Sequence, residues 1–271
     1  MQEQTKNGVT TTARSLNLIE YIQQHDGATV REITNDLDLS KSTVHKHLNT
    51  LVDHGYLAKR GEQYLLGLMF YNKGEYVQAE RRYFTVAREI VSELEAEVNE
   101  DVEFVVEMAG RGMIVCESND ERIRYGGSLQ FQHEGLYFPL HTMAAGKALL
   151  AEMSNDRIRE LANRQDLPAY TDETITTIDG LIAEVEATRE QGYAISREEF
   201  TEGLCAVSRC VRHGDGTVLG AITVCIPIFR ATEEELNQRL PRKIGKYVEE
   251  FEDRIGDHGS FQRLSYNETE F

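Results

Sequence analysis

The sequence of 271 residues contains no tryptophan, few cysteines and no long apolar run. Its most apolar stretch, Val218 to Phe229, is too short to cross a bilayer as a helix. The N-terminus lacks the basic start and apolar segment of a signal peptide. The four cysteines form no CxxC pair, and a large domain does not need disulfides. We therefore expect a cytoplasmic protein with free thiols and no membrane association.

Signatures of catalysis and nucleotide binding are also missing. The sequence has no GxGxxG, Walker loop, HExxH or GxSxG motif. Cys205, Cys210 and His213 follow one another closely, so a thiol-based redox or metal sensor, or an enzyme, is the alternative hypothesis. Residues along one strand do not converge by themselves. We therefore expect no enzyme, no metal site and no cofactor.

Basic residues are scarce, with 29 against 46 acidic residues and a net charge of −17. Residues 1–67 carry 7 basic and 8 acidic residues, whereas residues 68–271 carry 22 and 38. Only 8 of the basic residues are lysine. An acidic, lysine-poor surface is typical of halophilic archaea, where salt screens self-repulsion, although an ordinary acidic protein remains the alternative. The nearly neutral first part is compatible with nucleic acid as a partner.

The first part of the chain predicts three short helices and a hairpin. The second helix starts at Thr29, with Glu32 three residues later, as in a capping box. The third starts at Ser40 and ends near Gly55. Only residues 38–40 separate these two helices, which is typical of a helix-turn-helix.

The third helix separates apolar from polar side chains. Val44 and Leu48 share one sector, and the opposite face holds hydrogen-bonding and cationic groups without an early carboxylate. Such groups read base edges in the major groove, although any exposed helix face is polar. A hairpin around 59–63 would then be a wing that contacts phosphates. The predicted DNA-binding residues are Arg31, Ser42, Thr43, His45, Lys46, Asn49, Lys59 and Arg60.

The second part of the chain mixes strands and helices with adjacent hairpins, which favours an α+β domain with an antiparallel sheet. Small residues begin the helix at 143–152, where free backbone N–H groups would attract an acid. Strand alternation puts Thr223 and Cys225 on one face and Val224 on the other. Both patterns fit a small-molecule pocket or close packing. The other expected elements are an amphipathic helix at 87–98, strands at 102–108, 113–116, 193–196, 204–212 and 217–226, and helices at 178–191 and 233–255.

The runs L-S-K-S-T-V at 39–44 and L-N-T-L-V-D-H-G-Y-L at 48–57 resemble the winged helix of IclR-type transcriptional regulators. Segments 140–151, 192–204 and 221–227 resemble the GAF-like effector domain of the same family. The resemblance covers about residues 10 to 255. It implies a winged helix-turn-helix DNA-binding domain at 1–67, a linker helix at 68–80, an effector-binding domain at 81–256 and a tail at 257–271.

By this resemblance, the chain is a regulator that binds a palindromic operator in double-stranded DNA as a homodimer or dimer of dimers. It would respond to a small organic, sugar or aromatic acid. The implied effector contacts are Phe138, Ala144, Ala145, Ser196, Leu204, Ala206, Thr223 and Cys225. Ser196 stands where an acidic residue is common, and Ala206 where a cysteine or polar residue can occur. The resemblance therefore implies the location of the ligand but not its identity.

Overall fold

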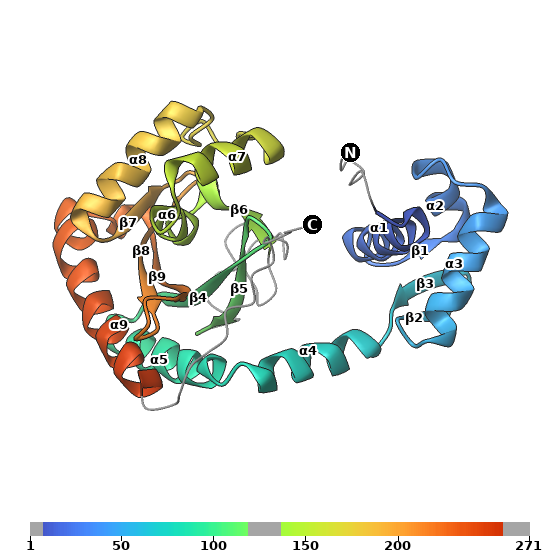
Figure 1. Ribbon diagram of the computed structural model, residues 1–271, viewed down its shortest axis with the longest axis horizontal. Coiled ribbons are helices and arrows are strands. Elements are labelled where there is room, and N and C mark those ends of the chain that lie inside the picture. Colours follow the sequence, from blue (N-terminus) through green and yellow to red (C-terminus); the bar gives the residue numbers. More distant parts are fainter. Residues whose placement is uncertain (1–7, 119–136, 257–271) are drawn as a thin grey trace. The chain divides into compact units, whose positions relative to one another are not determined.

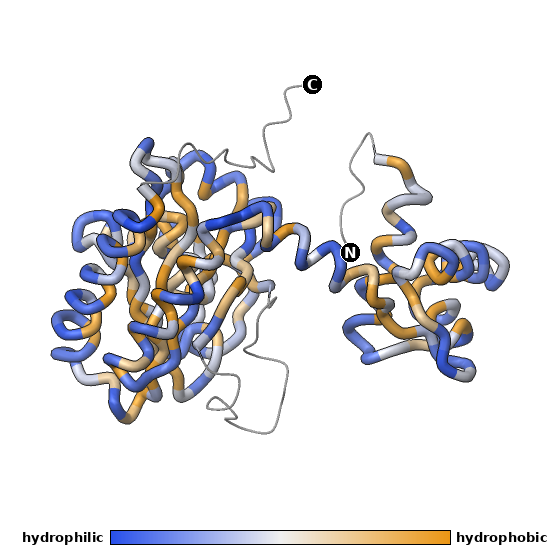
Figure 2. The backbone as a smooth tube through the Cα atoms, turned by 90° about the horizontal axis from the view of Figure 1, so that it is seen from below, coloured by the Kyte–Doolittle hydropathy of each residue, from blue (hydrophilic) through white to orange (hydrophobic). Residues whose placement is uncertain are grey.

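The computed structural model describes residues 8–118 and 137–256 (Figure 1). The predicted tail at 257–271 lies outside the described residues. Contacts divide the chain into two compact units, Met1–Arg81 and Arg82–Phe271. Within each unit the hydrophobic segments gather on the inside (Figure 2). None of the described helices is long and apolar enough to span a membrane.

The N-terminal unit is the predicted winged helix-turn-helix. A small antiparallel sheet has the order β1-β3-β2, and β2 and β3 form the predicted hairpin. The short strand β1 was not predicted, and it pairs Ala28 with Tyr64 of β3. The elements in chain order are α1 (Thr10–Gln24), β1 (Ala28–Thr29), α2 (Val30–Asp36), α3 (Lys41–Asp53), β2 (Leu57–Arg60), β3 (Gln63–Leu66) and α4 (Met69–Glu80).

The ends of these helices follow the predicted signals. The Thr29 hydroxyl accepts the N–H of Glu32, and the Glu32 carboxylate accepts the N–H of Thr29, which completes the capping box. The Ser40 hydroxyl caps α3 by accepting the N–H of Thr43. Gly55 ends the helix with a φ of +76°, a conformation that costs glycine little. In contrast, none of the residues in α4 is buried.

The C-terminal unit is an α+β domain, as predicted. Its antiparallel sheet has the strand order β6-β5-β4-β9-β8-β7. The elements are α5 (Tyr83–Val98), β4 (Asp101–Met108), β5 (Arg111–Glu117), β6 (Tyr137–Pro139), a 3-10 turn η1 (Leu140–Thr142), α6 (Ala144–Ala151), α7 (Asn155–Gln165), α8 (Ile178–Gln191), β7 (Ala194–Arg197), β8 (Leu204–Arg212), β9 (Val218–Pro227), a 3-10 turn η2 (Ile228–Arg230), a π-helical turn η3 (Glu235–Arg239) and α9 (Leu240–Gly256).

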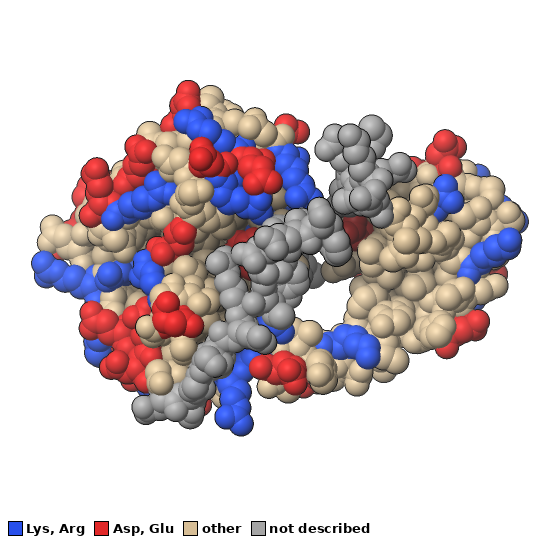
Figure 3. All heavy atoms as spheres, in the orientation of Figure 1, with Lys and Arg blue, Asp and Glu red and all other residues tan. Residues whose placement is uncertain are grey.

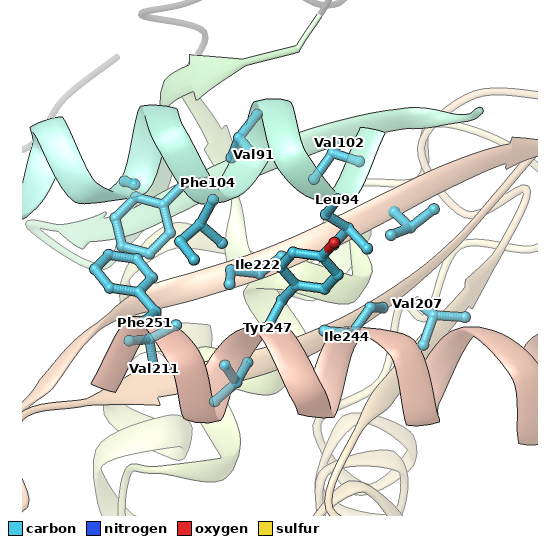
Figure 4. Close-up of a cluster of buried hydrophobic side chains, with 14 of the residues drawn as sticks. Val91, Leu94, Val102, Phe104, Val207, Val211, Ile222, Ile244, Tyr247 and Phe251 are labelled. Carbon is cyan, nitrogen blue, oxygen red and sulfur yellow. The ribbon is translucent and has the colours of Figure 1, made fainter. Parts of the chain in front are cut away.

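Different helices cover the two faces of this sheet. Helices α5 and α9 pack on what we call the α9 face, where Phe104, Ile222 and Val224 belong to one apolar cluster (Figure 4). Helix α6 packs on the opposite α6 face, against β8 and β9 and beside α8, and buries Ala206 and Cys225. The predicted alternation along β9 is therefore confirmed, since neighbouring residues point to different helix layers.

Three details of the C-terminal unit differ from the sequence prediction, and the first is the short strand β6, three residues that were not predicted as a strand. Helix α7 was not predicted, because only three of its residues, Ile158, Leu161 and Ala162, are buried. The closing helix at 233–255 is interrupted at its start by η3. Pro241, in the first turn of α9, has no N–H to donate, and its ring crowds the preceding turn. A wider π-helical turn just before it relieves that clash.

Candidate functional site

The predicted DNA-reading residues lie on the outer side of α3. Val44 and Leu48 anchor the inner side in the core of the N-terminal unit. Ser42, Lys46 and Asn49 are exposed, at spacings that put them on one side of a helix. Thr43 and His45 are half-buried, and the Thr43 hydroxyl lies 2.8 Å from the Ser40 hydroxyl of the cap. Exposed residues elsewhere complete the predicted set: Arg31 on α2, and Lys59 and Arg60 on β2.

Two contacts that the sequence did not reveal support this surface. Nδ1 of His47 lies 2.8 Å from the Ser15 hydroxyl and ties α3 to α1. The Lys59 ammonium lies 5.5 Å from the centroid of the Tyr64 ring, across the hairpin. Figure 3 shows few charged side chains on the visible face of the N-terminal unit and many on the C-terminal unit. This agrees with the uneven distribution of charge along the sequence.

The predicted effector residues lie together on the α6 face. Strand pairing places Ser196, Ala206 and Cys225 in one row across β7, β8 and β9, because directly opposite residues share a face. Thr223 lies in the next row, opposite Ser208. The Ser208 and Thr223 hydroxyls are 2.9 Å apart, and Ser208 also donates to the carbonyl of Ile222. Both side chains are fully buried.

The start of α6 lies over these rows. Ala144 and Ala145 are fully buried, and no side chain caps the helix. Gly146 permits this close packing, since a Cβ there would stand 2.0 Å from the carbonyl oxygen of Leu140. Phe138 covers Gly112 of β5 and is buried, whereas Leu204 is half-buried at the start of β8. All eight predicted effector residues thus pack on one side of the sheet.

A buried charge cluster adjoins the start of α6. The ammonium of Lys147, 1% exposed, lies 2.9 Å from Glu184 Oε1 and 2.7 Å from Glu199 Oε1. Burial raises the pKa of the Glu199 carboxyl, and the nearby Lys147 charge opposes that rise. The Thr174 hydroxyl donates to the backbone carbonyl of Glu199. No sequence pattern singled out Lys147, because lysine on a helix is usually exposed.

A second buried acid, Glu103 on β4, was also missed. It is 1% exposed, and among the described residues its carboxylate oxygens have no hydrogen-bond partner except the weakly donating Cys225 thiol. Burial is the largest of the influences that raise its pKa to about 8, followed by the negative charges of Glu117 and Asp101. The Cys225 thiol acts in the opposite direction. The one signal in the sequence that could have identified Glu103 is its position in a strand between two apolar residues, Val102 and Phe104.

The thiols offer no common site. Cys205 packs in the cluster on the α9 face and Cys210 in the cluster on the α6 face, since they are an odd number of positions, five, apart along β8. Burial raises the pKa of both thiols, which keeps them protonated. His213 instead lies with Nδ1 3.1 Å from Asp215 Oδ1. In the described parts of the chain, no three His, Cys, Asp or Glu residues form a metal-binding group. The geometry therefore gives the redox and metal alternative no support.

Comparison with known proteins agrees with both units. The profile of the IclR helix-turn-helix domain matches residues 11–61. The profile of the bacterial transcriptional regulator IclR C-terminal domain matches residues 77–251, more than half of the chain. The chain belongs to the IclR family. It is thus a transcriptional regulator with a DNA-binding helix-turn-helix and a C-terminal effector-binding domain, and not an enzyme.

Individual IclR-family relatives match over most of their length. The HTH-type transcriptional regulator Rv1719 of Mycobacterium tuberculosis is 32% identical over 252 residues, 90% of this chain and 93% of that protein. The probable HTH-type transcriptional regulator ArcR of Halobacterium salinarum is 28% identical, over 86% of this chain and 89% of that protein. A putative IclR regulator from Silicibacter has the same fold, with a TM-score of 0.75 at 20% identity, covering 91% and 96% of the two chains.

Proposed function

We propose that this IclR-family regulator recognises its operator through the outer face of α3. The observation that carries the proposal is the exposure of Ser42, Lys46 and Asn49 together, on a helix anchored by two buried residues. Amide, hydroxyl and ammonium groups are the donors and acceptors that base edges match in the major groove. Thr43 and His45 would read adjacent edges, while Arg31, Lys59 and Arg60 would hold phosphates.

Two kinds of substitution test this assignment on operator DNA selected from random duplexes. Asn49→Ala should relax sequence preference at one base pair and cost about 1–3 kcal/mol of specific binding. Lys59→Ala should weaken binding to all sequences alike and lower the salt slope by about 1. Lys246→Ala, an exposed lysine of the C-terminal unit, is the matched control. If Asn49→Ala lowers affinity equally for every sequence, the proposed reading by α3 is wrong.

We propose further that a small acid binds between the start of α6 and the sheet. The buried first turn of α6 lacks a side-chain cap, so its backbone N–H groups remain available to a carboxylate. Phe138, Ala144, Ala145 and Leu204 would form the walls, and Ser196, Ala206, Thr223 and Cys225 the floor. The effector would be an organic, sugar or aromatic acid, and it would shift DNA affinity by favouring one arrangement of the protein.

Thermal shift against a panel of such acids tests this site, because a ligand that binds only the folded state raises the melting temperature. Ala145→Leu places a larger side chain in the first turn of α6 and should abolish the shift caused by an acid that stabilises the wild type. Ala151→Leu, at the end of the same helix and half-buried, should preserve the shift. An acid that still stabilises Ala145→Leu fully would bind elsewhere.

The regulator would act as a homodimer or dimer of dimers on a palindromic operator, since protein and site then share a two-fold axis. The support is the set of exposed apolar residues on and before α4, Leu68, Tyr71, Tyr76 and Val77. Tyr71→Asp should lower the molar mass measured by light scattering, whereas Asp53→Ala on α3 should not. A wild-type monomer at micromolar concentration would contradict the proposal.

Because the proposed activity is binding to chromosomal DNA, we propose that the regulator works in the cytoplasm. The acidic, lysine-poor composition supports a salt-rich cytoplasm such as that of halophilic archaea. Each neutralised phosphate costs roughly 0.9 log units of affinity per log unit of salt. In such a cell, base-edge contacts would carry more of the binding. We therefore expect a smaller salt slope than a basic bacterial relative shows, and a slope that implies many phosphate contacts would contradict the halophilic assignment.

A further inference from the structure

Glu103 occupies the centre of the sheet that supports the proposed effector site. Strand β4 lies between β5 and β9, and Glu103 is opposite Glu117 on one side and Thr223 on the other. Its side chain therefore shares the α6 face with Thr223. Helix α6 packs against both β4 and β9. Glu103 thus belongs to the layer where the proposed ligand would lie.

The Glu103 carboxyl is buried at a cost that the described residues do not offset. An unpartnered buried polar group costs about 1–3 kcal/mol, and more when it is charged. The Thr223 hydroxyl, on the residue directly opposite Glu103, is already bonded to the Ser208 hydroxyl, which itself donates to the carbonyl of Ile222. The Cys225 thiol is a weak donor that only partly opposes the rise in the Glu103 pKa. The group therefore has unused capacity to accept hydrogen bonds.

The charges around Glu103 have the same sign as its own carboxylate. Asp101 and Glu117 both raise its pKa, so these two acids disfavour the ionised form of Glu103. A second carboxylate from a ligand would be repelled there. At neutral pH this pKa keeps most of the Glu103 acid protonated, and a ligand hydroxyl would not change that. A protonated nitrogen would stabilise the ionised carboxylate by hydrogen bonds and opposite charge, so its binding would release the proton of Glu103 to solvent.

We propose that Glu103 determines the specificity of the effector site by binding a protonated nitrogen of the ligand. The effector is then a small molecule with an ammonium or amidinium group at Glu103 and an acid group at the start of α6. This inference rests on the proposed effector site and specifies the class of molecule that fits it. Glu103 acts by direct contact with the ligand, and the neighbouring acids Asp101 and Glu117 add to the preference for a cation.

The test compares pairs of probes that differ only in nitrogen against oxygen, using the full-length protein at neutral pH. Suitable pairs are L-alanine with L-lactate, and γ-aminobutyrate with 4-hydroxybutyrate, since all four carry the acid group as well. We expect at least one nitrogen-containing probe to raise the melting temperature well above the effect of its oxygen partner. Glu103→Gln should weaken that probe by at least tenfold, measured by calorimetry. Glu107→Gln, on the same strand but bonded to the N–H of Gly110, should bind it as the wild type does.

Glu103→Gln replaces a buried acid by a neutral amide of nearly the same shape, so the variant keeps its fold, as operator binding without ligand would verify. If oxygen probes or simple acids stabilise the protein as well as nitrogen probes, the inference about Glu103 is wrong and the effector site stands. If no nitrogen probe exceeds its partner, the inference is wrong as well. The panel of acids and the Ala145→Leu variant then test, independently of Glu103, whether the effector site exists.

Discussion

The two faces of the C-terminal sheet receive alternate residues of the same strands, yet they differ in chemistry. On the α9 face, Phe104 and Val224 pack among large apolar side chains from α5 and α9. On the α6 face, the helices also contribute large apolar side chains, but the adjacent residues Glu103 and Cys225 lie in rows of small or polar residues of the sheet, Ser196, Ala206, Ser208 and Thr223. The α9 face can gain hydrophobic stabilisation at every position. The α6 face has less of this hydrophobic stabilisation, because it places polar groups beneath the start of α6.

This difference indicates a division of tasks within each strand. Natural proteins depart from ideal burial mainly at functional sites, where stability is given up for recognition. Substitutions on the α9 face should therefore change stability and leave the ligand response intact. Substitutions on the α6 face should do the reverse, except at Lys147, whose charge is itself buried.

The largest effect is expected on the α9 face from Phe104→Ala. Phe104 is fully buried against Phe251, with ring centroids 5.3 Å apart. The variant should lose about 3–5 kcal/mol of the free energy of unfolding, because it removes a large apolar group and leaves a cavity. Urea unfolding of the C-terminal unit measures this. Thr223→Val on the α6 face is the comparison, and an equal loss in both variants would remove the distinction between the faces.

Lys147→Met should cost about 3 kcal/mol, since removing one partner of a buried pair leaves the other charge uncompensated. Glu199 is the partner left buried, and its protonation should restore part of the stability as the pH falls. Lys246→Met is the control, because Lys246 is 65% exposed and lies 3.5 Å from Glu97 Oε2. A stable Lys147→Met variant without pH dependence would show that the cluster contributes little.

Glu103→Gln should alter how stability depends on pH. The folded-state pKa of about 8 exceeds the ordinary value of 4.5, so wild-type stability is lost as the pH rises from about 4.5 through about 8. The variant lacks this loss and should gain more than about 1.4 kcal/mol relative to the wild type between pH 5.5 and 9, the equivalent of one pKa unit. Asp101, Glu117 and the Cys225 thiol face the same group and remain in both proteins. A constant difference between the two proteins would mean that Glu103 is paired or solvated.

Ser208→Ala should give a small change, about 1–2 kcal/mol, because it removes two hydrogen bonds that each typically contribute about 0.5–1.5 kcal/mol. It removes the bonds to Thr223 and to the carbonyl of Ile222. Chemical unfolding measures the free energy of unfolding of Ser208→Ala. Cys210→Ala, at another buried position of the same strand, is measured in parallel as the control. If Ser208→Ala lowers the free energy of unfolding as much as Phe104→Ala does, Ser208 is one of the main stabilising residues. The two faces of the sheet would then not differ in their contribution to stability.

The elements with strong local signals were predictable from the sequence. The capping box at Thr29, the cap at Ser40 and the glycine at 55 gave the helix-turn-helix nearly residue by residue. The strand at 204–212 and the helix at 178–191 have the predicted bounds. In contrast, β1 contains only two residues, and only a distant partner makes them a strand. Helix α7 buries too few apolar side chains to show a clear period.

The buried polar residues were not predictable, and their cause lies in tertiary structure. In a strand, alternation of acidic and apolar residues usually marks one solvated face, so Glu103 looked exposed. Helix α6 covers that face instead. Lys147 is buried because two glutamates, from α8 and from the segment before β8, meet it there. Such contacts join residues 37 and 52 positions apart, which no local pattern encodes.

Helix α4 has twelve residues, buries none of them and contains Gly74 near its middle. An isolated helix of this length is only marginally stable in water, and an internal glycine costs it about 1 kcal/mol relative to alanine. Its helix–coil equilibrium therefore depends on whatever covers its exposed tyrosines. Covered by the partner of the proposed dimer, the segment would become stiff and transmit rotations from one unit to the other. Uncovered, it would fray and transmit none, so the proposed assembly would determine how stiffly the two units are joined.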